Sequence, residues 1–309
     1  MTLVCCREND DGGDMCEILK IRKSLQALVG GCLLLLTLPC EADLPLAVEG
    51  LLTEKGRLRL DVGVSYANSD KQKISTGEYL AVQTGPTNFV YLPTRVGEGT
   101  VNSDVGVGTL GLKYGVHDGL EIYGRTSWFI ASSRSSELNG SFQTSDKGMS
   151  DLWIGASYRF TGELVASAET ALLEKHNGNS SSLKSVLLGL TTYKSIDPVV
   201  LSAAGAYKFS ISRDEAAATY KAGSYLMLNP SLGFAVNEKV SLTSGLQWTL
   251  RFPDQINGVN QSVRHTRTDL VMGFAYGFDR GSILNFYLKS NVSGRNGADL
   301  RAVWMYTFP

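Results

Sequence analysis

The sequence predicts an all-β protein, a transmembrane antiparallel up-and-down β-barrel of about 12 strands, from two main observations. Apolar and polar residues alternate with period two over segments of about ten residues, and every second link between these segments is short. The composition agrees, because 33 Gly, 13 Tyr and 11 Phe accompany only 19% charged residues in the 309-residue chain. Average soluble domains carry more charge and less glycine.

The segment 57–66 shows the alternation most clearly. Its odd-numbered positions carry two arginines, Asp61, a glycine and Ser65, whereas every even-numbered position is apolar or aromatic. A strand places these two sets on opposite faces, while a helix would scatter the polar residues around its axis. Strands are expected near 57–67, 104–116, 120–131, 149–160, 164–175, 184–195, 199–211, 224–236, 240–252, 266–278, 283–291 and 298–308.

The links between these segments alternate in length. The short ones carry the Gly, Pro, Asn and Asp of tight turns, and they are 117–119, 161–163, 196–198, 237–239 and 279–281. The longer ones are 68–103, 132–148, 176–183, 212–223, 253–265 and 292–297. Outer-membrane barrels alternate short periplasmic turns with longer outer loops in this way. Within the first long link, 77–95 alternates weakly, which predicts either a protruding hairpin or two more strands and a count of 14.

The apolar face of these strands is expected to contact lipid. The strands are near ten residues long and carry ionisable groups at their centres, which must face water or one another. The expected lumen-lining charges are Arg59, Asp61, Lys113, Glu121, Arg125, Asp151, Arg159, Glu169, Lys208, Arg251, Arg267, Asp269, Lys289, Asp299 and Arg301.

These charges support two interpretations. They stiffen the wall through mutual ion pairs, or their basic excess, nine against six, biases the lumen towards anions. Because the first and last strands must pair to close a barrel, we expect Arg59 and Asp61 to neighbour Asp299 and Arg301. Twelve strands lie between the side-chain-filled barrels of about eight and the open porins of 16–18. We therefore expect a narrow lumen, or one blocked by a loop or by the segment 43–56, which is otherwise a periplasmic leader.

The N-terminus predicts export behind a cleaved signal peptide. A basic stretch at 20–23 precedes the apolar core 25–38, and small residues then lead to an expected cut after Ala42. The domain plan is 1–42 as leader and signal peptide, 43–56 as N-terminal segment or plug, and 57–309 as barrel. Translation starts at Met1 or at Met15, and lipidation at Cys40 is the alternative to simple cleavage. All five cysteines precede the expected cut, at Cys5, Cys6, Cys16, Cys32 and Cys40.

Little in the sequence indicates catalysis. The three histidines, His117, His176 and His265, are far apart, and the metal-hydrolase and nucleophile-elbow motifs are missing. We therefore expect no cofactor, no metal and no enzyme activity, with a barrel hydrolase using His265 as the enzyme alternative. Removing 1–42 takes away four of 29 basic and six of 30 acidic residues, which leaves a net charge near +1 and argues against a nucleic-acid partner. The expected partners are outer-membrane lipid, a small-molecule solute and the barrel-assembly machinery.

The last strand carries the expected assembly signal. Trp304, Tyr306 and Phe308 share one face that ends one residue from the C-terminus. This resembles the terminal aromatic signal of outer-membrane barrels, although here Pro309 follows the last aromatic residue.

Three stretches, 44–66, 193–201 and 297–308, resemble a family of outer-membrane barrels linked to the meta-pathway of phenol degradation. They are similar also to the barrel of channels that export functional amyloid subunits. The resemblance implies a twelve-stranded channel in the outer membrane of a Gram-negative bacterium, passing small apolar or aromatic compounds or an unfolded polypeptide. The amyloid exporters carry a long N-terminal coiled-coil segment, whereas only about 13 residues separate the expected cut from the first strand here. A sealed structural or adhesive barrel is the competing function.

Overall fold

The computed structural model describes residues 52–76, 79–93, 96–137, 140–176, 179–215, 218–278, 281–293 and 297–309. The expected leader 1–42, residues 43–51 of the expected N-terminal segment, and positions 279–280 of one expected turn lie outside this part of the chain. The chain divides into two compact units, Met1–Glu41 and Ala42–Pro309, and the fold described is that of the second. The described residues include no helix long and apolar enough to cross a membrane.

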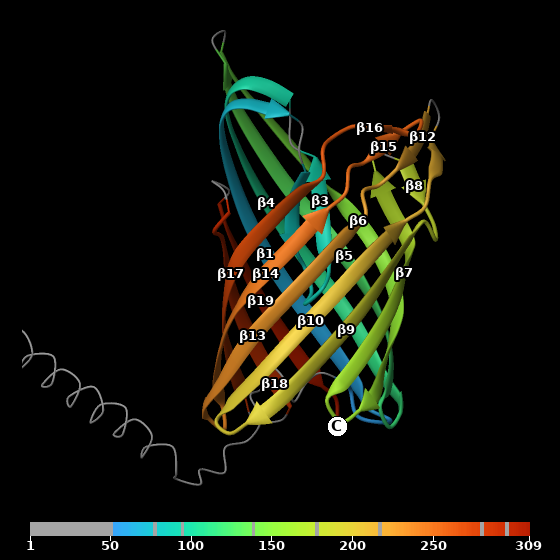
Figure 1. The fold of residues 1–309 in the computed structure, drawn as a ribbon, viewed down its shortest axis with the longest axis vertical. Helices are drawn as coiled ribbons and strands as arrows, with labels where there is room; N and C mark the ends of the chain where they lie inside the picture. The colour runs from blue at the N-terminus through green and yellow to red at the C-terminus, as the bar shows by residue number, and fades with distance from the viewer. Residues whose placement is uncertain are drawn as a thin grey trace, which may run out of the picture. The chain divides into compact units, whose positions relative to one another are not determined.

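A closed antiparallel barrel dominates the second unit (Figure 1). Within the described residues its wall has twelve strands, each hydrogen-bonded to the next, and β1 pairs with β19 to close the ring. The twelve are β1 (Leu58–Thr76), β4 (Val96–His117), β5 (Leu120–Glu137), β6 (Gly140–Thr161), β7 (Leu164–His176), β9 (Ser185–Ile196), β10 (Val199–Ser210), β13 (Tyr225–Asn237), β14 (Val240–Arg251), β17 (His265–Phe278), β18 (Ser282–Asn291) and β19 (Ala298–Thr307). The expected barrel with 12 strands is confirmed.

The alternative count of 14 strands is wrong. β2 (Tyr79–Gln83) and β3 (Phe89–Pro93) pair only with each other and form a separate two-stranded sheet. They have no place in the wall, because β1 and β4 pair continuously from Leu58↔Tyr114 to Thr76↔Val96. The hairpin 79–93 therefore joins the far ends of two strands that are already paired.

Four wall strands are markedly longer than the sequence pattern predicts, and one of them, β5, continues from 131 to Glu137. β1 continues nine residues past Ala67, β4 begins at Val96, and β6 begins at Gly140. The added part of β1 reads NSDKQKIST, which lacks apolar alternation. A strand that rises out of the membrane meets water on its outer face, so its side chains give no two-faced signal.

Short strands connect the wall strands at the long-link end of the barrel, and tight turns connect them at the other end. β11 (Arg213–Glu215), β12 (Ala218–Lys221), β15 (Gln255–Ile256) and β16 (Val259–Asn260) form a four-stranded sheet above the ends of their neighbours (Figure 1), and β8 (Asn179–Ser181) extends β7. At the opposite end, the turn 117–119 has Gly119 at φ +83°, a conformation that glycine adopts without a Cβ penalty.

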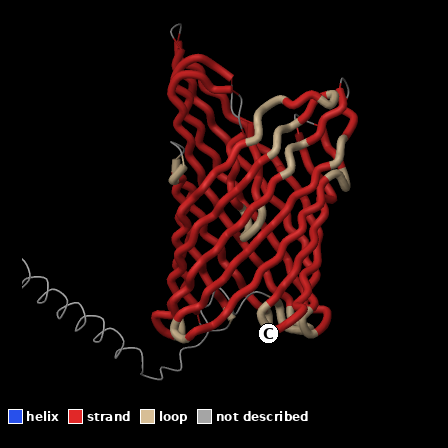
Figure 2. Tube along the Cα trace, viewed as in Figure 1, coloured by secondary structure: helices blue, strands red, loops and turns tan. Residues whose placement is uncertain are grey.

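The outer surface of the wall is apolar. Along β1, Val64 is 62% exposed and Tyr66 is 42% exposed, while the alternate residues Ser65 and Ala67 are buried. The same pattern recurs on the other strands, whose exposed faces carry Leu, Ile, Val and aromatic side chains (for example Ile130 at 68%). This arrangement inverts that of a soluble protein, so the outer face is suited to lipid and the tilted, closed ladder in Figure 2 satisfies the backbone there.

A charge on this outer face should destabilise the barrel according to depth. Val64→Lys, in the middle of β1, is expected to lower the free energy of unfolding in lipid vesicles by about 2–4 kcal/mol. Val116→Lys, on the same kind of face beside the turn 117–119, should cost about 0–1 kcal/mol. Urea titrations of both variants measure this, and equal losses would contradict the assignment of the outer face.

Candidate functional site

The hairpin 79–93 lies inside the barrel. Its Leu80, Val82 and Val90 are buried, and they form one cluster with Ala67, Val105 and Val107 from the inner faces of β1 and β4. Figure 2 shows its turn, 84–88, within the barrel between the two ends. The expectation that 77–95 forms a protruding hairpin is therefore wrong. These apolar side chains bury more surface when the hairpin folds inward.

The opposite side of the hairpin contacts the far wall. Phe89 and Tyr91 pack on Tyr225 of β13, with ring centroids 5.4 Å and 5.7 Å away. Tyr225 belongs to a buried cluster that includes Trp153 of β6 and extends over β7, β9, β10 and β13. The hairpin thus spans the lumen from wall to wall and divides it.

Polar contacts fix the tip of the hairpin. The Tyr225 hydroxyl donates to the Thr87 carbonyl oxygen at 3.1 Å, and the Asn88 amide donates to the Glu169 carboxylate at 3.3 Å. At the start of the turn, the Ser65 hydroxyl donates to the Gln83 carbonyl oxygen at 2.9 Å. The Lys289 ammonium donates to the Gln83 side chain at 3.4 Å.

A cation also lies against an aromatic ring of this hairpin. The Arg251 guanidinium is 4.0 Å from the centre of the Tyr91 ring. Burial raises the pKa of the Tyr91 hydroxyl to about 12, so this side chain is neutral over the physiological pH range and the contact is of the cation–π kind. The hairpin is therefore attached to the wall by apolar, hydrogen-bonded and cation–π contacts together.

Most of the predicted lumen charges form ion pairs on the buried face of the wall. In one group, Asp61 lies 3.2 Å from both Arg59 and Lys113. In a second group, Asp269 and Asp299 share Arg267 and Lys289 at 2.7–4.0 Å. The remaining pairs are Arg125–Glu169 at 3.0 Å, Lys208–Glu174 at 2.9 Å and Arg251–Asp254 at 3.2 Å.

The partners in the last two pairs, Glu174 and Asp254, were missed by the sequence reasoning. Glu174 has the opposite parity to Glu169 on β7, so unbroken alternation would place it on the outer face. A β-bulge restores it to the inside: Trp153 pairs with Ala171 and Leu152 with Leu173, so β7 carries one extra residue. Asp254 lies beyond the end of β14, where no alternation applies.

The expected neighbours across the closing seam are wrong. Arg59 pairs with Thr307 and Asp61 with Met305, whereas Ser65 and Ala67 pair with Arg301 and Asp299. The strands of a barrel are staggered, so residues equally far from the two chain ends are not opposite one another.

Glu121 has a different kind of partner. Its carboxylate accepts hydrogen bonds from the backbone N–H of Thr53 at 2.7 Å and from the Thr53 hydroxyl at 2.6 Å. Thr53 and Leu52 are buried, and the Gly56 N–H donates to the Gly115 carbonyl at 2.8 Å. A side chain at Gly115 would collide with the Glu54 backbone, so the glycine permits this close approach. The described part of segment 43–56 therefore lies against the inner face of β4 and β5.

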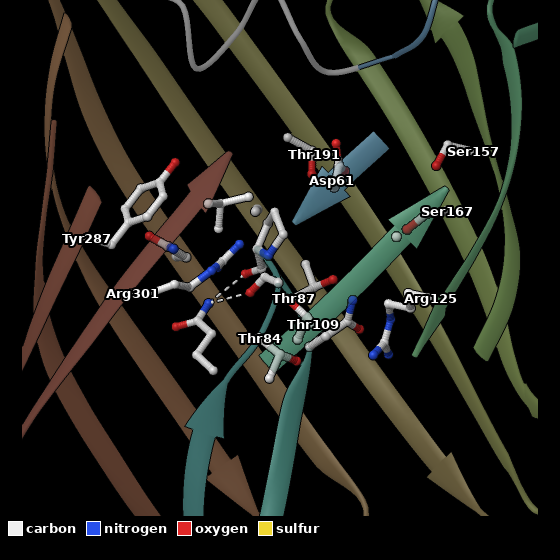
Figure 3. Close-up of a pocket in the computed structure, with 18 of the residues that line it drawn as sticks. Asp61, Thr84, Thr87, Thr109, Arg125, Ser157, Ser167, Thr191, Tyr287 and Arg301 are labelled. Carbon is white, nitrogen blue, oxygen red and sulfur yellow. Dashed lines mark hydrogen bonds between the residues drawn. The ribbon is translucent and has the colours of Figure 1, made fainter. Parts of the chain in front are cut away.

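A cavity of about 350 Å³ adjoins the hairpin tip. The turn 84–88 forms one side of it, and inward side chains from the wall form the others, including Asp61, Arg125, Tyr287 and Arg301 (Figure 3). The cavity is therefore a part of the lumen that the hairpin leaves unfilled.

Besides Glu121, three predicted charges have no oppositely charged side chain within 4 Å among the ion pairs of the described residues: Arg159, Arg301 and Asp151. Arg159 lies at the short-turn end, where its backbone N–H donates to the Gly119 carbonyl oxygen. Arg301 lies on the cavity, with its guanidinium 5.4 Å from the Tyr287 ring centre.

The terminal aromatic residues lie on the outer surface. Trp304 and Phe308 are exposed, and the rings of Trp304, Tyr306 and Phe308 contact one another in succession, with centroids 5.9 Å and 4.9 Å apart. The Trp304 indole N–H donates to the Ser282 hydroxyl at 2.6 Å. Their expected role as an assembly signal stays a prediction.

No protein-family model and no curated protein matches this chain. Among solved structures, it is similar to an outer membrane channel from Pseudomonas putida F1, at 18% identity and a TM-score of 0.58, over 83% of this chain and 97% of that one. The translocator domain of the autotransporter NalP from Neisseria meningitidis gives 10% identity and a TM-score of 0.48, over 84% and 91%. At these identities the likeness shows the fold alone. This fold, with its closed ladder and apolar exterior, is that of a transmembrane barrel.

Loss of the Glu121 charge should loosen the segment before β1. Glu121→Gln keeps an acceptor for Thr53 but removes the charge that makes such hydrogen bonds about twice as strong. If the substitution weakens the attachment of this segment by about 1.4 kcal/mol, the state in which the segment is detached from the wall becomes about tenfold more populated. Trypsin cleavage at Lys55 in the folded barrel measures this. Glu163→Gln, at an exposed turn of the same end, is the control, and equal cleavage rates in the two variants would contradict the anchor.

Proposed function

We propose that this protein is an outer-membrane channel for the passive passage of small solutes, not an enzyme. One observation carries the proposal: inside the closed wall, the hairpin leaves a cavity of about 350 Å³ whose lining includes ionisable side chains. Burying charges in a sealed interior costs more than packing apolar groups there. Charged side chains around a cavity are instead suited to a water-filled path.

The size of the path favours small solutes. An unfolded polypeptide could not pass unless the hairpin 79–93 left its contacts on both walls, so polypeptide export is disfavoured. The resemblance of the sequence to barrels of the meta-pathway of phenol degradation supports small apolar or aromatic compounds. Counting Glu174 and Asp254, nine basic residues face eight acidic ones, and this small basic excess supports anions.

A sealed structural or adhesive barrel is the second candidate. The observation that favours it is the apolar packing of the hairpin against both walls, which closes part of the lumen. Passage then requires the cavity to connect around the hairpin or the hairpin to move. Electrical conductance separates the two candidates.

Excision of the hairpin should enlarge the channel. Because Thr76 pairs with Val96, residues 77–95 can be replaced by an Asn-Gly turn without disturbing the wall. In planar bilayers we expect small discrete current steps from the unaltered barrel, with an anion-favouring reversal potential in a salt gradient. The excised variant should show steps several times larger.

Removal of a hairpin that lies outside the lumen controls for the effect of deleting a hairpin as such. The N–H of Gln261 donates to the Asp254 carbonyl at 2.8 Å, so a short turn can replace 255–260, which lies outside the lumen. This variant should conduct like the unaltered barrel. Silence from folded barrels with and without 77–95 would overturn the channel, and equal conductance in both would remove the hairpin from the path.

A further inference from the structure

Arg301 is a cavity-lining cation with no carboxylate within 4 Å among the ion pairs of the described residues, and Asp61 acts on its charge only from farther away. Its side chain is partly buried, its Nε has no hydrogen-bond partner, and its guanidinium lies 5.4 Å from the centre of the Tyr287 ring. Opposite it in the sheet are Ser65 on β1 and Tyr287 on β18, neither of which is acidic. Every other cation on the described lining of the cavity has a carboxylate within 4 Å.

The nearest acidic residues are already occupied. Asp299, two residues before Arg301, lies 2.9 Å from Lys289 and 3.8 Å from Arg267. Asp61, on the neighbouring strand, lies 3.2 Å from each of two cations. With Asp269, which also pairs with Arg267 and Lys289, three carboxylates are shared among four cations on this side of the lumen, and Arg301 adds a further positive charge.

The surroundings of Arg301 are those of a binding site. Figure 3 shows Arg301 and Tyr287 together on one side of the cavity, with Arg125 on the other. Val303, two residues further along β19, also lines the cavity. Removing a cation from water without a partner is costly, and an anion that enters the cavity would supply the missing charge. The Tyr287 ring and Val303 provide an apolar surface beside that charge.

We propose that Arg301 binds the carboxylate of a small organic acid as it passes through the lumen. The guanidinium presents paired N–H donors in a plane, which matches the two oxygens of a carboxylate. The apolar body of the acid then lies against Tyr287 and Val303. The inference rests on the proposed function only in requiring that solutes reach the lumen.

Benzoate and its uncharged analogue benzamide test the site. Calorimetric titration of the full protein in detergent measures binding without requiring passage. We expect benzoate to bind at least tenfold more tightly than benzamide, and Arg301→Gln to weaken benzoate at least tenfold. Arg301→Lys, which keeps the charge but loses the paired donors, should weaken benzoate several-fold.

Arg159→Gln is the matched control, because Arg159 also lacks a carboxylate partner but lies beside Gly119 at the short-turn end. It removes the same charge and should change benzoate affinity less than twofold. Equal losses in both glutamine variants, equal affinity for benzoate and benzamide, or no binding to a barrel shown to be folded by heat-shifted electrophoretic mobility would each overturn the site.

Current measurements separate the site from the channel. Benzoate added to a conducting barrel should reduce the chloride current, and Arg301→Gln should relieve this block. Benzoate binding without any current would overturn the channel and leave the site standing. Current and block that are unchanged by Arg301→Gln would overturn the site and leave the channel standing.

Discussion

Closure of the strand ladder is the constraint on which the rest of this structure depends. In lipid, each backbone N–H and C=O needs a partner within the protein, so β1 must pair with β19. That pairing fixes the twelve-strand circumference and the stagger that sets Arg301 opposite Ser65 instead of Asp61. It also fixes an interior too wide for wall side chains to fill in the way that they fill smaller barrels.

The hairpin 79–93 fills part of this wide interior. Its apolar residues have no lipid to contact, and inside the barrel they bury against β1 and β4 on one side and against Tyr225 and Trp153 on the other. Each fully buried side chain of this size contributes about 1.5–3 kcal/mol. The polar tip, 84–88, extends beyond these clusters and borders the cavity, where Asn88 and Thr87 bond to the wall.

The lumen charges complement this arrangement. Where the hairpin packs, neighbouring charges are held in pairs such as Arg125–Glu169 and Arg251–Asp254. On the wall formed by β18, β19 and β1, the cations exceed the carboxylates that they share, and Arg301 has no carboxylate partner among the described residues. The hairpin therefore narrows the lumen, and the uneven distribution of charge defines which side of the remaining space attracts an anion.

The sequence by itself determined the turns and the faces, since period-two alternation reports directly on a wall with lipid on one side and water on the other. It left the strand count open between 12 and 14, and the pairing of β2 with β3 decided for 12. It placed Asp61 and Glu169 among the lumen charges, but not Glu174, because a bulge breaks the parity. Only the tertiary structure decided that 79–93 folds inward, which charges pair, and that Arg301 has no carboxylate within 4 Å among the ion pairs of the described residues. These features depend on stagger and on contacts between residues far apart in the chain, such as Asn88 and Glu169, and local alternation carries no information about either.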